Sequence, residues 1–291
     1  MLPKTPTPVS KKWVIRLFSL IVTLSYLSSC SAVLRVEHAS KLQEAQDLFN
    51  EAADMENTLK SEGMPESLTS PNNRIEAAYR TSHAMVSSLI QKQRTQLSQD
   101  DLLGTAYTLK AIIEWRLGEY AAANQTVREV DSMQVSVFPR DEALLAALPS
   151  LIQNDKAKHF MDMKSESFDT IVDLLSSSIS DLDSVMQIAP SMNSMRLYLL
   201  TSQLAALKNW NDLLAQPNDY VTNPPSDNTL DALEESLCSE VTVPVWTSFT
   251  TEVKRLDSAG ACNTYNFFFD LISPDACSAE VEDKENCDAK N

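Results

Sequence analysis

Glycine is scarce in this chain of 291 residues, which contains only four, at positions 63, 104, 118 and 260. Tight hairpins, phosphate-binding loops and nucleophile elbows need glycine where φ is positive or where backbone must approach closely. The sequence also contains no GxGxxG, GxxxxGK[ST] or GxSxG motif. These absences argue against nucleotide-binding folds and α/β-hydrolases, and they are compatible with an array of helices.

Basic residues are also few. The chain has 24 Lys and Arg against 40 Asp and Glu, which gives a formal net charge of −16. Nucleic acids and anionic lipid surfaces bind proteins through clustered positive charge. We therefore expect no nucleic-acid partner, and any attachment to a membrane would have to be covalent rather than electrostatic.

Histidine occurs three times, at widely spaced positions, and none stands in a recognisable catalytic pattern: His38, His83 and His159. Asp181 and Asp183 alternate as calcium ligands do, but the glycine and the closing glutamate of an EF-hand loop are missing. The sequence therefore predicts no catalytic residue, no metal site and no cofactor.

Long hydrophobic runs are absent as well. The longest apolar stretch, residues 17–27, would form a helix of roughly 16 Å, about half the span of a bilayer core. Four basic residues and no acid precede it, and small residues follow. This order is typical of a secretory signal peptide. The alternative, an uncleaved anchor that starts near Trp13, requires the span to continue into Arg35 and Glu37.

Cysteine is missing between residues 31 and 237, so Cys30 stands alone near the N-terminus. The stretch Leu27-Ser28-Ser29-Cys30 resembles the lipobox of bacterial lipoproteins. That resemblance implies cleavage after residue 29, a diacylglyceryl thioether on Cys30, and a further fatty chain such as palmitate on the new amino group. Two or three acyl chains anchor a protein stably, whereas one does not. The alternative is an ordinary signal peptide in which the cysteine is incidental.

The same resemblance implies a location in the cell envelope. In lipoproteins of enterobacterial type, Asp after the lipidated cysteine favours the inner membrane, and this chain has Ser31 there. We therefore expect the outer membrane, facing the periplasm. Without residues 1–29 the chain would keep 20 basic against 40 acidic residues and become still more acidic.

The other four cysteines all lie in the last 54 residues: Cys238, Cys262, Cys277 and Cys287. An even set in an exported protein predicts two disulfides, with three possible connectivities. Sequential pairing, 238 with 262 and 277 with 287, is slightly favoured. A zinc site is the alternative, but the set has no CxxC pair and no neighbouring histidine.

Apolar residues recur at helical spacing from residue 40 to 215, which predicts an all-α domain. Helices are expected from about 40 to 62, from 72 to 94, from just after Ser98, from 165 to 188 and from 192 to 215. Asp141 could cap a short helix that Pro149 kinks or ends, and a connection is expected over 153–166.

The composition also suggests domain boundaries. The chain divides into a signal peptide (1–29), a lipidated tether (30–39), a helical domain (40–215), a linker (216–228) and a disulfide-stapled helical region (229–291). In the last region, VTVPVW would separate two helices. An aromatic cluster, residues 265–269, would lie buried near the C-terminus or form an adhesive edge for a partner.

Residues 100–130 carry a more specific pattern. Tyr107, Ala111, the turn Gly118-Glu119-Tyr120 and Ala123 are spaced as in a helical hairpin with close helix approach. This segment resembles a tetratricopeptide repeat, and residues 45–52 (AQDLFNEA) resemble its second helix. Lys110 and Glu114 depart from the family pattern, because Leu and an aromatic residue are usual there. A non-repetitive helical bundle is the alternative.

The repeat resemblance implies a concave surface that holds a peptide or a helix of another protein. We therefore expect a membrane-anchored periplasmic scaffold or adaptor, not an enzyme, with a protein partner bound through Tyr107, Lys110 and Glu114. A small-molecule-binding accessory component of an envelope transport system is the alternative function.

Overall fold

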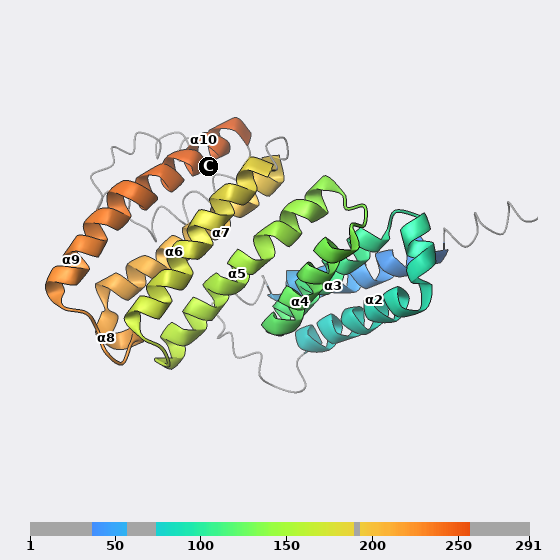
Figure 1. The fold of residues 1–291 in the computed structure, drawn as a ribbon, viewed down its shortest axis with the longest axis horizontal. Coiled ribbons are helices and arrows are strands. Elements are labelled where there is room, and N and C mark those ends of the chain that lie inside the picture. Colours follow the sequence, from blue (N-terminus) through green and yellow to red (C-terminus); the bar gives the residue numbers. More distant parts are fainter. Residues whose placement is uncertain (1–36, 57–73, 189–192, 257–291) are drawn as a thin grey trace, which may run out of the picture. The chain divides into compact units, whose positions relative to one another are not determined.

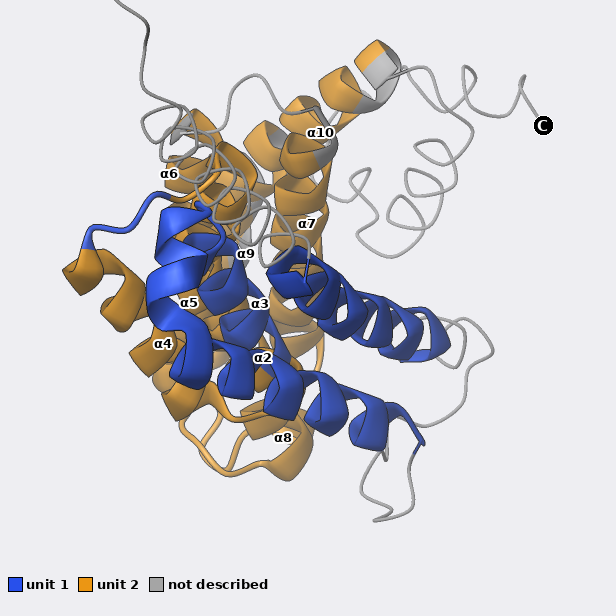
Figure 2. Cartoon of the chain, turned by 90° about the vertical axis from the view of Figure 1, so that its right-hand side faces the viewer, with its two compact units in different colours: residues 1–113, 134–136 blue, residues 114–133, 137–291 orange. Residues whose placement is uncertain are grey.

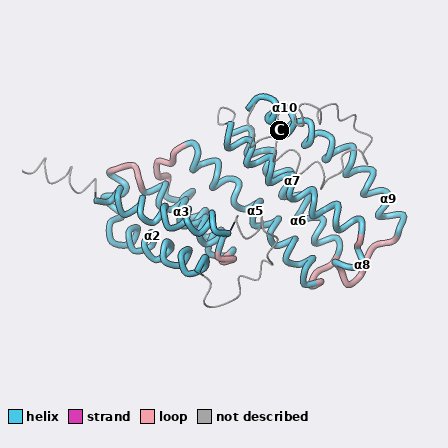
Figure 3. Tube along the Cα trace, turned by 180° about the vertical axis from the view of Figure 1, so that it is seen from behind, coloured by secondary structure: helices cyan, strands magenta, loops and turns pink. Residues whose placement is uncertain are grey.

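The computed structural model describes residues 37–56, 74–188 and 193–256 (Figure 1). Within these ranges the chain forms helices and turns without a β-strand, which confirms the all-α prediction (Figure 3). Among the helices described, none combines the length and the hydropathy needed to cross a bilayer.

The described helices occur in the following order along the chain. They comprise residues 37–56, α2 (Arg74–Gln99), α3 (Leu103–Arg116), α4 (Tyr120–Met133), α5 (Pro139–Met163), α6 (Phe168–Ile188), α7 (Asn193–Ala215), α8 (Pro217–Tyr220), α9 (Asp227–Ser236), the π-helical turn η1 (Leu237–Thr242) and α10 (Val243–Leu256).

The chain divides into two compact units, coloured separately in Figure 2. Unit 1 comprises residues 1–113 and 134–136, and unit 2 comprises residues 114–133 and 137–291. The division falls inside α3. The domain boundaries expected from composition, near residues 39, 215 and 228, stay predictions.

In unit 1 the helix over residues 37–56 packs against α2. Ala45 and Ala52 are fully buried, and small side chains of this kind let two helices approach closely. The ring of Phe49 lies 5.6 Å from that of Tyr79 between centroids. Where the helices meet, Ser82 Oγ donates a hydrogen bond of 2.6 Å to the carbonyl oxygen of Ala45.

In unit 2 the long helices α5, α6, α7 and α10 pack in neighbouring pairs, α5 with α6, α6 with α7, and α7 with α10 (Figure 1). Along α6, Val172 is half-buried, and the apolar residues beside it at three- and four-residue spacing are buried: Phe168, Ile171, Leu175, Ile179, Leu182 and Met186. On α7, apolar residues occur on more than one face, and this helix contacts α6 and α10 as well as α5. The helix is therefore buried on more than one side.

Two turns around α3 illustrate how local chemistry ends a helix. Gly118, in the predicted break between α3 and α4, has φ of 72°, a conformation that glycine adopts without strain. Before α3, the expected helix start just after Ser98 would place Asp100 and Asp101 in the first turn of that helix. That expectation was wrong, because α2 extends to Gln99 and α3 begins only at Leu103. Asp101 adopts φ of 57°, which Asp tolerates better than most residues.

The segment from Pro139 to Met163 departs most from expectation. It forms one helix of 25 residues, with Pro139 at its start and Pro149 in its interior. The predicted connection over 153–166 is therefore wrong for residues 153–163. An interior proline costs about 3 kcal/mol. Here the helix also buries Leu145, Leu148, Leu151 and Ile152, and this packing offsets the cost.

Residues 216–256 are also more helical than composition suggested. Pro217–Tyr220 form the short α8, within the segment expected to be a linker. The expected separation of two helices at VTVPVW is wrong, because α9, η1 and α10 follow one another without an intervening loop. Pro244 lies at the second position of α10, directly after the π-helical turn.

Candidate functional site

The residues expected to bind a partner all lie on α3, but two of them are buried. Tyr107 is 4% exposed and Glu114 is 3% exposed, whereas Lys110 is half-buried. The carboxylate of Glu114 accepts a hydrogen bond of 2.6 Å from Thr126 Oγ1 on α4, and Thr126 is itself buried. In this structure Glu114 therefore joins two helices rather than lining an open surface, and only Lys110 of the three reaches solvent.

The other expected site residues have less structural description. Cys30, Cys262, Cys277 and Cys287 lie outside the described residues, as does the aromatic cluster 265–269. Cys238 lies in η1, and its backbone alone is described. Lipidation and disulfide formation stay predictions.

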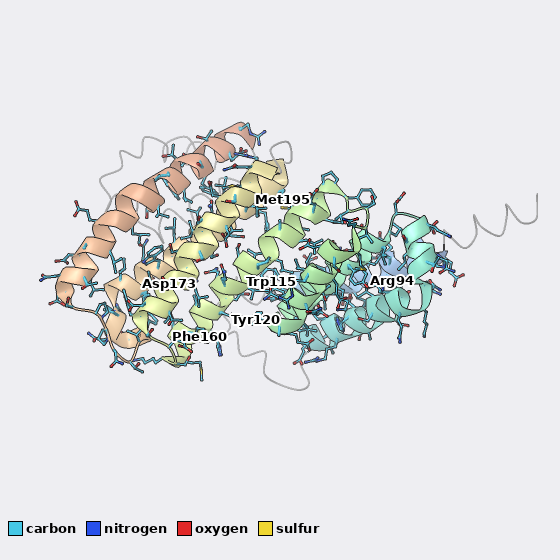
Figure 4. The ribbon with its side chains drawn as sticks, viewed as in Figure 1. Arg94, Trp115, Tyr120, Phe160, Asp173 and Met195 are labelled. Atoms are coloured by element: carbon cyan, nitrogen blue, oxygen red, sulfur yellow. The ribbon has the colours of Figure 1, made fainter. Side chains whose placement is uncertain are left out.

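A group of polar and aromatic side chains in unit 2 lies near Asp155. Trp115 Nε1, at the end of α3, donates a hydrogen bond of 2.6 Å to Asp155 Oδ2 on α5. The guanidinium of Arg116 lies over the ring of Trp115 at 4.4 Å, within cation–π range. On α4, the ring centroid of Tyr120 lies 6.0 Å from Lys156 Nζ. Trp115 and Tyr120 are labelled in Figure 4. We call these five residues the Asp155 cluster.

The pKa values of two tyrosines, Tyr120 of this cluster and Tyr198 on α7, are raised. Burial, reinforced by the charge of Asp155, raises the pKa of Tyr120 to about 12. Burial also raises the pKa of Tyr198 on α7, although the nearby Arg116 opposes the effect. Both phenols therefore stay protonated at neutral pH and can donate hydrogen bonds, but they cannot serve as bases.

A second polar junction ties α7 to α10. Glu252 accepts hydrogen bonds from Arg196 Nε at 2.8 Å and from Arg255 Nε at 2.9 Å. Burial alone would raise the pKa of Glu252, but the two guanidinium groups outweigh it and lower that pKa below its ordinary value. Glu252 is 6% exposed, so its charge is held by these partners rather than by water.

In unit 1 two pairs of buried polar groups connect distant parts of the sequence. Tyr79 Oη donates to Glu56 Oε2 at 2.7 Å. His38 Nδ1 lies 3.6 Å from Asp100 Oδ2, and both side chains are largely buried. Sequence reasoning missed both pairs, because the partners are 23 and 62 residues apart and no local motif links them.

Metal chemistry has no support in this part of the chain. Within residues 37–56, 74–188 and 193–256, no three His, Cys, Asp or Glu side chains come close enough together to hold a metal ion. Of the three histidines, His38 is buried, His83 is half-buried, and His159 is exposed beside Phe160.

Comparison with known proteins gave no relative: no family model, no curated protein and no solved structure matches the chain.

Proposed function

We propose that the chain is a lipid-anchored protein of the bacterial cell envelope that works as a helical scaffold or adaptor for a protein partner. The observation that carries this proposal is the stretch Leu27-Ser28-Ser29-Cys30, placed directly after a basic segment and a short apolar run. A motif of four residues is informative here because it stands where a lipobox must stand. Ser31 favours the outer membrane by the same analogy.

The helical part supports the scaffold half of the proposal. The hairpin of α3 and α4, with its glycine turn, is similar to a tetratricopeptide repeat, and arrays of such hairpins bind peptides and helices of other proteins. The repeat pattern does not extend to α2, α5, α6 and α7, because these helices run for 21 to 26 residues, longer than a repeat of about 34 residues allows for each of its two helices. We therefore restrict the repeat interpretation to the α3–α4 hairpin and residues 45–52.

The charge of the chain indicates the kind of partner. With 40 acidic against 24 basic residues, long-range attraction favours a partner with a positively charged surface. Exposed positions of α6 are acidic or small and polar, including Asp169, Asp173, Asp181 and Asp183. Of the three residues expected to bind a partner, Lys110 is the one accessible enough to test.

The anchor is tested with Cys30→Ser and the neighbouring control Ser31→Ala. We expect the control to fractionate with outer membranes and to carry the mass of fatty chains at its N-terminus, because its lipobox is intact. Cys30→Ser should be released from membranes and lack that mass. Retention of Cys30→Ser in the membrane fraction would refute the anchor, and Ser31→Asp should move the protein to the inner membrane.

The scaffold is tested with a photo-crosslinking amino acid at three positions of the full chain in cells. Lys110 and Asp173 are accessible, and buried Leu175 serves as the matched control on the same helix as Asp173. We expect one discrete protein adduct from an accessible position and none from Leu175. If no adduct forms, and native mass spectrometry instead finds a bound small molecule, the carrier function replaces the scaffold.

A further inference from the structure

The last three helical elements that the structure describes form one continuous arm. α9, η1 and α10 follow one another from Asp227 to Leu256 without a loop, and we call these residues the α9–α10 arm. Outside the arm, the described helix that α10 chiefly packs against is α7 (Figure 1). By contrast, α5, α6 and α7 each pack against at least two other helices of unit 2. The arm can therefore separate when chiefly one helix interface is broken.

The connection that precedes the arm gives it little support. Residues 222–226 join the arm to the rest of unit 2, and four of these five residues are exposed, whereas Pro225 is half-buried. Pro224 and Pro225 have no backbone N–H, so neither can donate a hydrogen bond to the helices of unit 2. The position of the arm is therefore determined by its contacts with α7 and not by this connection.

Apolar packing and one charged junction hold the arm against α7. Val245, Trp246 and Phe249 of α10 are buried. Glu252 of the same helix accepts a hydrogen bond from Arg196 of α7. These contacts make the closed arm the major state.

The same face of α7 also carries polar groups that find no partner. Gln203 and Trp210 follow Arg196 at intervals of seven residues, so the three side chains lie on nearly the same face of the helix. Gln203 Nε2 donates to the carbonyl oxygen of Ile179 on α6. Gln203 Oε1 and Trp210 Nε1, however, are buried without a hydrogen-bond partner in the described part of the chain.

The arm contributes an unpartnered group of its own. Thr242, the last residue of η1, is 1% exposed, and its hydroxyl has no hydrogen-bond partner within the ranges that the structure describes. A buried polar group of this kind has lost its water without gaining a replacement, and this cost is removed when the group returns to solvent. The unpartnered groups therefore favour opening, whereas the contacts of Glu252 and Phe249 oppose it.

We infer that the α9–α10 arm is a hinged cover of α7, which opens as a unit about residues 222–226 while α5, α6 and α7 stay folded. Opening separates Glu252 from Arg196 and returns the hydroxyl of Thr242 to water. It exposes the face of α7 that bears Arg196, Gln203 and Trp210. The cover depends on neither the lipid anchor nor a partner, so its failure would leave the proposed function intact.

The opening is measured by hydrogen exchange and mass spectrometry on the full chain, at several urea concentrations below the unfolding transition. We expect amides of α10 to exchange at least about tenfold faster than those of α6, through an opening that urea promotes because it exposes buried surface. Equal exchange in α10 and α6 would overturn the inference, since the arm would then open only when unit 2 unfolds. Fast exchange in α10 without urea dependence would also overturn it, because this result indicates fraying.

Two buried threonines provide a matched pair of variants. Thr242 and Thr126 are each 1% exposed, but Thr126 donates a hydrogen bond to Glu114, whereas the hydroxyl of Thr242 has no partner. Thr242→Val should slow exchange in α10 about tenfold, because closing the arm no longer desolvates an unpartnered hydroxyl. Thr126→Val should instead speed exchange in α4 and leave α10 unchanged. Unchanged or faster exchange in α10 of Thr242→Val would contradict the inference.

Discussion

Two helix pairs in this chain share one contact but differ in the side chains around it. Ser82 of α2 donates to the Ala45 carbonyl oxygen in unit 1, and Ser178 of α6 donates to the Ser150 carbonyl oxygen in unit 2. The first pair of helices also buries ionisable residues near the two ends of the helix over residues 37–56, namely His38 and Glu56. In the described residues of α5 and α6, the buried side chains other than the two serines are apolar.

The difference indicates that the two pairs depend on different forces. Apolar packing in the α5–α6 pair depends on volume and is nearly independent of pH. Buried ionisable groups in unit 1 contribute little net stability when satisfied but cost much when their partners are removed. We therefore expect α5 and α6 to be sensitive to cavities, and the pair of residues 37–56 with α2 to be sensitive to loss of hydrogen bonds.

The largest effect is expected from a cavity in the α5–α6 pair. Leu175 is fully buried, and Leu175→Ala should lower the free energy of unfolding by about 3 kcal/mol through lost burial and the void it leaves. Urea denaturation monitored by circular dichroism measures the loss, and hydrogen exchange should locate it in α5 and α6. Exposed Ser177→Ala is the control. A loss below about 1 kcal/mol would mean that this pair is not tightly packed.

The next effect concerns the buried hydrogen bond between Tyr79 and Glu56 in unit 1. Tyr79→Phe removes this donor and should cost about 2 kcal/mol, because the buried carboxyl oxygen of Glu56 loses its contact with the phenol. Tyr120→Phe, at a half-buried phenol of unit 2, is the matched control and should cost less. Hydrogen exchange in α2 reports the change locally. Equal losses in the two variants would remove the contrast between the units.

The comparison of buried polar contacts with apolar packing extends to unit 2 through Glu252, whose contribution to stability should depend on pH. The folded pKa of Glu252 is lowered, so its carboxylate stabilises the fold at pH above its unfolded pKa of about 4.3, and this contribution disappears as the pH falls through the lower folded value. Glu252→Gln should cost about 1.5 kcal/mol at pH 7. The gap between variant and wild type should shrink by pH 3. A gap that is constant with pH would show that charge is not its source.

The smallest effect tests what the pairs share. Ser82→Ala and Ser178→Ala each remove one buried neutral hydrogen bond and should each cost about 1 kcal/mol. Thermal unfolding of both variants beside the exposed control Ser177→Ala measures the losses. A much larger loss at Ser82 would mean that its contact is coupled to the polar groups around it.

Much of the helix content was predictable, because burial follows the period of the sequence. The helices expected over 165–188 and 192–215 correspond to α6 and α7, since each was inferred from the spacing of the helix's own apolar residues. Errors arose where contacts between residues far apart in the sequence determine the local structure. Pro149 suggests a break, yet α5 continues because it packs along α6 and α7.

The polar contacts of the candidate site could not be predicted in the same way. Thr126 with Glu114, Trp115 with Asp155 and Arg196 with Glu252 are separated by 12, 40 and 56 residues. Side-chain partners at such distances are selected by the helix arrangement, and nothing local marks them. Glu114 was interpreted as a surface departure from a repeat pattern because its partner lies on the next helix.

The π-helical turn η1 also bears on how this chain can vary in length. Because a π-helical turn contains one residue more than an α-helical turn, deleting one residue from Leu237–Thr242 could restore a plain α-helix. That deletion would rotate α9 by about 100° relative to α10, since successive α-helical residues are separated by that angle. Gain or loss of a single codon at this turn would thus redirect the face of α9 while α10 keeps its register against α7.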